Sequence, residues 1–83
     1  METKLIKYVT PLDNARILAI FDSSEIRIYD TKPLRKKWEI FEWLDNQEIH
    51  NSVKVDCGGY GIIWNSELDL SAAEIYDNGQ ILI

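Results

Sequence analysis

Apolar and polar residues alternate in the first thirty positions in a way that predicts three short strands joined by turns. The predicted elements are, in order, a strand over 4–10, a turn over 11–14, a strand over 15–21, a turn over 22–24 and a strand over 25–29. In the third strand Ile26 and Ile28 share one face and Arg27 lies on the other, which is typical of a sheet with one face in water. The short turn before it predicts a hairpin.

The spacing becomes helical in the middle of the chain. Four apolar residues recur at intervals of three or four, namely Leu34, Trp38, Phe41 and Leu44. Ile40 and Trp43 lie off this stripe, which favours two short helices with a break over one continuous helix. Asp30 or Thr31 can cap the first helix, where Pro33 fits its first turn. A weak capping box over 45–48 predicts another short helix over 46–51.

The remaining residues return to strand patterns and end in one more helix. Strands are predicted over 53–55, 60–64 and 68–70, with a glycine-rich turn over 57–61. Ser71 and Glu74 form a capping box for a helix over 71–76, which ends at Asn78–Gly79 with glycine as a left-handed cap. These elements predict one α+β domain over residues 1–83, with a mainly antiparallel sheet, a helical middle segment and a short C-terminal helix.

Composition limits the classes of function. Nine aromatic residues and an apolar fraction of 46% suffice for a core and exclude a disordered chain. No apolar run approaches the roughly 18 residues that span a bilayer, and the first residues begin no secretion signal. One cysteine agrees with a reducing compartment. We therefore expect a cytoplasmic protein that does not enter a membrane.

The net charge of −5 makes nucleic acid an unlikely partner, because such binding depends on Lys and Arg. The local exception is a basic cluster, Lys32, Arg35, Lys36 and Lys37. An acidic domain fits a basic protein partner better, although the charge alone also serves solubility.

The sequence contains no recognisable catalytic constellation. Cys57–Gly61 lacks the lysine of a phosphate-binding loop and precedes a strand, so Gly58, Gly59 and Gly61 are interpreted as a structural turn. We expect a positive φ at Gly58 or Gly59, and a neighbouring ring over Gly61. His50 is the sole histidine and pairs with Cys57 only if the fold brings them together. We expect no catalytic residue, cofactor or metal.

Three tryptophans and an apolar C-terminal tail are the candidates for binding. Trp43 lies off the helical stripe and is the candidate partner-facing ring. Ile81, Leu82 and Ile83 suit a strand that pairs with an existing sheet edge, either the chain's own or that of a second copy. These side chains could instead fill the domain's own core. A small core without a disulfide favours a homodimer.

Several segments together resemble a bacterial family, the domain of unknown function 2442. They are Phe41–Asp45, Val53–Asp56, Gly58–Trp64, Asp69–Leu70 and Ile75–Tyr76, with the earlier strand end Ile28–Asp30. The resemblance implies a small α+β protein without established enzymatic activity. Many relatives are encoded beside another short protein, and the pairs have been proposed as toxin–antitoxin systems. The helix-turn-helix extension of some relatives is absent after Gly79.

Two functions from different classes follow. The first is a non-enzymatic binding or regulatory module, an antitoxin-like partner of a small, basic, toxin-like protein. The alternative is a small enzyme or ligand-binding domain that uses Cys57, His50 and the glycine turn. A third, weaker hypothesis is nucleic-acid binding through residues 32–37.

Overall fold

The computed structural model describes residues 4–83, so the first three residues of the predicted domain lie outside it. The first part of the chain is a three-stranded meander, and a helical segment follows it. Its elements are β1 (Ile6–Leu12), β2 (Arg16–Phe21), β3 (Ile26–Asp30), the 3-10 helices η1 (Lys32–Lys36) and η2 (Glu39–Asp45), and the helix α1 (Gln47–Asn51).

The second part of the chain builds another sheet and returns to the first one. Its elements are β4 (Lys54–Val55), the 3-10 turn η3 (Cys57–Gly59), β5 (Gly61–Asn65), β6 (Leu68–Ser71), the helix α2 (Ala72–Asn78) and β7 (Gln80–Ile81). The predicted α+β class with antiparallel sheets and a short C-terminal helix is confirmed.

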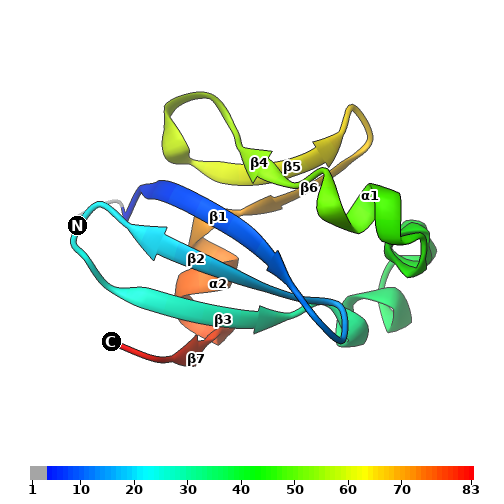
Figure 1. The fold of residues 1–83 in the computed structure, drawn as a ribbon, viewed down its shortest axis with the longest axis horizontal. Helices are drawn as coiled ribbons and strands as arrows, with labels where there is room; N and C mark the ends of the chain where they lie inside the picture. The colour runs from blue at the N-terminus through cyan, green and yellow to red at the C-terminus, as the bar shows by residue number, and fades with distance from the viewer. Residues whose placement is uncertain (1–3) are drawn as a thin grey trace.

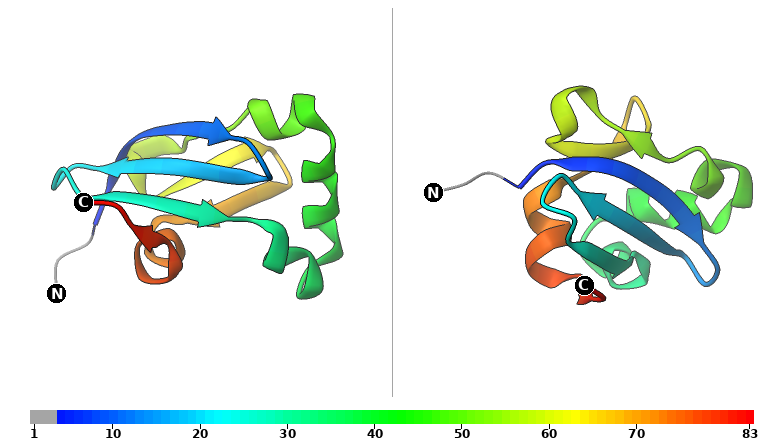
Figure 2. Two further views of the ribbon diagram at one scale, coloured as in Figure 1. Left: turned by 60° about the horizontal axis from the view of Figure 1, so that its bottom comes forward. Right: turned by 60° about the vertical axis from the view of Figure 1, so that its left-hand side comes forward.

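Two antiparallel sheets form the body of the molecule (Figure 1). One has the strand order β1-β2-β3-β7 and the other β4-β5-β6. Figure 2 shows η1, η2 and α1 gathered at one end of the sheets, and Figure 1 shows α2 behind the four-stranded sheet. The core lies between these layers, where Ile17, Phe21, Ile62 and Ile75 are fully buried. The outer face of the four-stranded sheet is turned to the viewer in Figure 1.

The first turn lies later than predicted. Pro11 and Leu12 belong to β1, and the chain reverses at Asn14 and Ala15, both with φ near 60°. Proline is tolerated here because β1 is an edge strand, where one side of the backbone needs no sheet hydrogen bond. The predicted hairpin of β2 and β3 is confirmed, with Leu18 opposite Ile28.

The helical middle segment contains the predicted break, at Trp38, whose backbone is extended. Both pieces are 3-10 helices, and Leu34, Phe41 and Leu44 are buried as the stripe predicts. The prediction is wrong for Trp38, which is 54% exposed because the break turns it away from the core. At the helix starts, Asn46 caps α1 with its side chain, whereas Thr31 makes no side-chain cap.

Ser71 caps α2 as predicted, since its hydroxyl accepts a hydrogen bond from the Glu74 N–H at 3.1 Å. The Glu74 carboxylate completes no box and instead accepts a hydrogen bond from the Tyr29 hydroxyl at 2.8 Å. The left-handed cap predicted at Gly79 is wrong, because its φ is −75°. A Cβ at Gly79 would lie 2.5 Å from the Ile75 carbonyl oxygen, so close packing is what requires glycine there.

Candidate protein-binding surfaces

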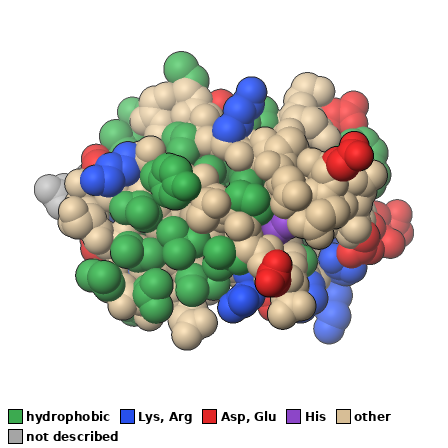
Figure 3. Space-filling model, in the orientation of Figure 1, with side chains coloured by type: hydrophobic (Ala, Val, Ile, Leu, Met, Phe, Trp, Pro, Cys, Tyr) green, Lys and Arg blue, Asp and Glu red, His purple; other side chains and the backbone are tan. Residues whose placement is uncertain are grey.

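The outer face of the four-stranded sheet is apolar. Cross-strand register places its side chains in three rows: Tyr8, Ile20 and Ile26; Thr10, Leu18, Ile28 and Gln80; and Leu12, Arg16 and Asp30. All are partly or fully exposed. Figure 3 shows hydrophobic side chains in a continuous area over β1, β2 and β3, with charged side chains at its margin. Only the third of these rows contains charged side chains, namely Arg16 and Asp30.

Strand β3 turns its arginine inward. Arg27 is 4% exposed, while Ile26 and Ile28 face out. The alternation of β3 is as predicted, but the face in contact with solvent is the one that carries the two isoleucines and not the one that carries Arg27. The Arg27 guanidinium donates hydrogen bonds to the carbonyl oxygens of Tyr76 at 3.2 Å and Ile83 at 3.3 Å, and it pairs with Glu25 at 3.3 Å. A buried guanidinium requires such partners, so the fold supplies them from three elements.

Glu25 completes this inner cluster. It accepts hydrogen bonds from the Tyr76 hydroxyl at 2.6 Å and the Ser23 hydroxyl at 2.7 Å, and Lys4 lies 3.1 Å away. These donors, led by Tyr76, lower the pKa of Glu25 from 4.5 to about 2. The same contact raises the pKa of Tyr76. The cluster holds α2 and the tail on the sheet. Its only local signal in the sequence is the arginine between two isoleucines.

The C-terminal tail pairs with the chain's own sheet, which is the first of the two predicted alternatives. Gln80 and Ile81 form β7 beside β3, and Ile26 and Ile83 are joined by a hydrogen bond at 2.9 Å. The alternative in which the tail side chains fill the core is excluded, because Ile81, Leu82 and Ile83 are between 51% and 72% exposed. The backbone of the tail therefore pairs with β3, while its side chains add apolar area to the surface.

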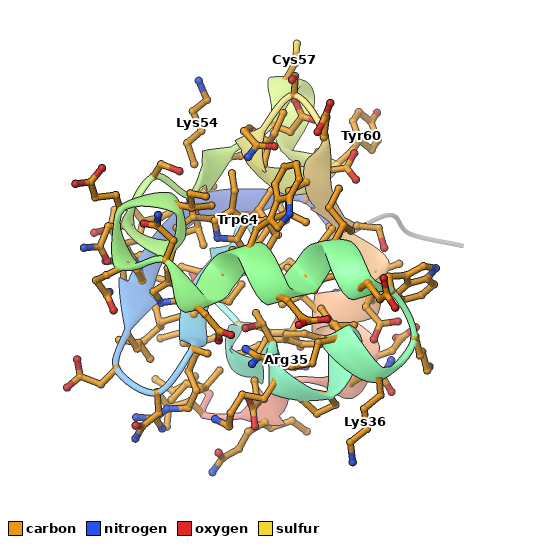
Figure 4. The ribbon with its side chains drawn as sticks, turned by 90° about the vertical axis from the view of Figure 1, so that its right-hand side faces the viewer. Arg35, Lys36, Lys54, Cys57, Tyr60 and Trp64 are labelled. Atoms are coloured by element: carbon orange, nitrogen blue, oxygen red, sulfur yellow. The ribbon has the colours of Figure 1, made fainter. Side chains whose placement is uncertain are left out.

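A groove runs between η2 and β6. A cleft of about 310 Å³ is lined by Trp38, Ile40, Phe41 and residues 67–71. Its wall is supported from the core, since the ring of Phe41 lies 6.2 Å from Trp38 on one side and 6.2 Å from the buried Trp64 on the other. Figure 4 faces η2 and shows Trp64 behind it. The hollow continues past Ile40 to Trp43, which is 44% exposed.

Four exposed carboxylates border this groove: Glu39, Glu42, Glu67 and Asp69. The ion pairs found within residues 4–83 involve Glu25, Asp30 and Asp45, and none of the four groove carboxylates. We call Trp38, Ile40 and Trp43 with these four residues the tryptophan groove. These carboxylates lie next to exposed aromatic rings. The groove therefore suits a ligand with positively charged groups, which would form ion pairs with the carboxylates and cation–π contacts with the rings.

The basic cluster of residues 32–37 is partly neutralised. Lys32 lies 3.1 Å from Asp30, and Arg35 lies 2.8 Å from Asp45. Lys37 lies over the Trp38 ring at 5.9 Å. Two of the four cations are thus held by carboxylates of the chain itself, which weakens the case for binding a phosphate backbone.

The glycine turn is structural. Gly58 and Gly59 have φ values of 79° and 81°, which confirms the expected positive φ. A Cβ at Gly61 would lie 2.6 Å from the Leu70 carbonyl oxygen, so a neighbouring backbone, and not the expected ring, requires glycine there. Cys57 is exposed in this turn (Figure 4).

The fold does not bring Cys57 and His50 together. His50 is buried and its Nε2 lies 2.9 Å from the Leu12 carbonyl oxygen, whereas the thiol faces solvent. Among residues 4–83 no group of three or more metal-ligating side chains occurs. No helix in this part of the chain is long and apolar enough to cross a bilayer. In the described part of the chain, the thiol–imidazole pair on which the alternative hypothesis depends is therefore not formed.

The fold and its surfaces define a small α+β protein of two antiparallel sheets. A family model described as "Protein of unknown function (DUF2442)" matches residues 6–80, and the chain therefore belongs to this family, as its residues suggested. The searches of curated proteins and of solved structures find no match.

Proposed function

We propose that this protein is a non-enzymatic binding module that holds a small basic protein in the tryptophan groove. The observation that carries the proposal is the set of four unpaired carboxylates around an apolar cleft. Exposed charge of one sign attracts and orients a partner of the opposite sign, while aromatic side chains supply the contact area.

The arrangement suits a segment that carries both cationic and apolar side chains. Trp38 and Trp43 offer ring faces at the surface, and Ile40 lies half-buried between them. Lysine or arginine of the partner would meet Glu39, Glu42, Glu67 or Asp69, and aliphatic side chains would enter the cleft. The net charge of −5 adds long-range attraction for such a partner.

We further propose that the role of this contact is antitoxin-like, in that it masks a toxic small protein. The separation of Cys57 from His50 within residues 4–83 supports binding over catalysis. In such a role the groove covers a functional surface of the partner, so loss of the groove should release the partner's toxicity.

Copurification from the native cell with a tagged chain tests the contact. We expect a small protein of net positive charge in stoichiometric amount, retained less well as salt rises. The double variant Glu39→Lys, Glu42→Lys should release it. The matched control Asp13→Lys, Asp77→Lys has the same net charge and alters exposed carboxylates elsewhere. Equal retention by both variants, or no stoichiometric partner, would contradict the proposal.

A growth assay then tests the antitoxin-like role. The captured partner expressed alone should arrest growth, and coexpression of the parent or the control should restore it, whereas the groove variant should not. If the partner expressed alone does not arrest growth, the antitoxin-like role is contradicted, while the proposal of a binding module still stands.

A further inference from the structure

Strand β2 is apolar on both faces. Ile17, Ala19 and Phe21 point into the core, and Leu18 and Ile20 lie on the outer face. Antiparallel strands with one wet face usually alternate apolar and polar residues, while continuous apolar runs are typical of strands covered on both sides. Within residues 4–83, Ile17, Ala19 and Phe21 are buried on the inner face, whereas Leu18 and Ile20 stay partly exposed on the outer face.

The neighbouring strand shows the same lack of cover. Ile26 and Ile28 of β3 lie outside, and with Leu18 and Ile20 they form the centre of the first two rows. The partly buried apolar residues that pack on the core are Ile40, Ile49, Val55, Leu70 and Tyr76, and none of them comes from these rows. The four aliphatic side chains therefore form a patch separate from the core.

The lack of charge on this patch indicates what covers it. The first two rows contain only apolar or neutral polar residues, Tyr8, Thr10 and Gln80 among them. The exposed Lys7 lies at the bulge beside Tyr8, at the margin of the face. A chain with net charge −5 repels a second copy through most surfaces, so an approach between copies needs a face without charge. A cationic partner would instead bind at the tryptophan groove, where carboxylates lie along η2 and β6.

The area of the face agrees with a weak symmetric dimer. Ten side chains, in strands about 4.8 Å apart and rows about 6.8 Å apart, cover about 330 Å² on each copy. Leu82 is half exposed, follows Gln80 by two residues and extends this surface beside Ile26. Two such faces stay below the roughly 1,000 Å² at which a specific interface begins, so the dimer we expect is weak.

We propose that the outer face of the β1-β2-β3-β7 sheet docks on the same face of a second copy. The contact is isologous, so each residue of the patch meets its equivalents across a two-fold axis. The two sheets stack face to face, with Leu18 and Ile28 in the centre. This contact is independent of the tryptophan groove, and either can fail without the other.

Sedimentation equilibrium over a series of protein concentrations tests the proposal. We expect the mass of the parent to rise from monomer to dimer in the micromolar range, and to persist at high salt because the contact is apolar. Leu18→Lys should remain monomeric throughout. The control Ser66→Lys adds the same charge in an exposed turn and should dimerise like the parent.

Three outcomes would overturn the dimer. They are a parent that is monomeric at every concentration, a Leu18→Lys variant with the mass of the parent, and a dimer that high salt dissolves. If Leu18→Lys fails to fold by circular dichroism, Ile28→Thr provides the test, because threonine suits a strand and removes apolar contact. A folded Ile28→Thr variant that dimerises as strongly as the parent would then contradict the proposal.

Discussion

The two faces of the four-stranded sheet differ in what covers them. The inner face contains a buried arginine held by a helix carbonyl, a tail carbonyl and a carboxylate. The outer face contains four aliphatic side chains that are partly exposed and lie outside the core that residues 4–83 form. The comparison shows that burial follows from the partners that other elements provide, and not from the hydrophobicity of a residue alone. Alternation defines which residues share a face, while tertiary structure decides which face turns inward.

The largest expected effect comes from removing the guanidinium. Arg27→Met removes the side-chain donor to the carbonyl oxygens of Tyr76 and Ile83 and the cation beside Glu25, which weakens the attachment of α2 and the tail. We expect the free energy of unfolding to fall by about 2–4 kcal/mol, as for a buried polar group that loses its partner. Urea denaturation measures it. If Arg27→Met is as stable as the parent, the inner face does not depend on the cluster.

Gly59→Ala tests the support of β1 on the inner face. The substitution adds strain at a positive φ and places a Cβ 2.6 Å from the Ile6 carbonyl oxygen. We expect a loss of about 2 kcal/mol. Gly58→Ala is the matched comparison, since its Cβ meets only the exposed Tyr60 ring, and it should lose about 1 kcal/mol. Equal melting temperatures of the two variants would refute the contact with Ile6.

Ser71→Ala weakens the helix that covers the inner face. The variant removes the hydroxyl that accepts a hydrogen bond from the Glu74 N–H. We expect a loss of about 1 kcal/mol in thermal unfolding. Ser66→Ala, in an exposed turn, should melt like the parent. No difference between these variants would show that the cap does not stabilise α2.

The smallest effect concerns pH. The pKa of Glu25 is lowered in the folded state, so its contribution to stability is complete above about pH 4.5 and is lost as the pH falls towards 2. Glu25→Gln should therefore unfold more easily at pH 7 and lose less stability than the parent between pH 4.5 and 2. The control Glu67→Gln should follow the parent. Parallel acid curves for parent and Glu25→Gln would contradict the assigned cause.

Much of the fold could be predicted because its signals are local. The hairpin of β2 and β3, the presence of a break in the helical segment though not its place, the Ser71 cap and the positive φ of the glycine turn all depend on neighbouring residues. The errors arise where distant segments meet. Gly79 and Gly61 are required by close backbone approach from elsewhere in the chain, and no local pattern contains that information.

The candidate surfaces could be predicted only in part. The pattern singles out Trp43 because it lies off the apolar stripe, and the structure shows its ring 44% exposed. Its role at an interface stays a prediction. The groove could not be predicted, since it joins η2 with β6 and its carboxylates come from both. The outer face depends on the inward turn of Arg27, whose partners lie 49 and 56 residues away.

That separation along the chain has a kinetic consequence. The β1-β2-β3 meander closes through short turns, so its contacts can form early, as local contacts generally do. The partners of Arg27 reach it only after α2 and β7 have docked, and until then the guanidinium remains hydrated. We therefore expect Arg27→Met to accelerate unfolding while it leaves the refolding rate almost unchanged, as for a residue whose contacts form after the transition state. The lifetime of the native state would then depend mainly on how long α2 and the tail stay docked.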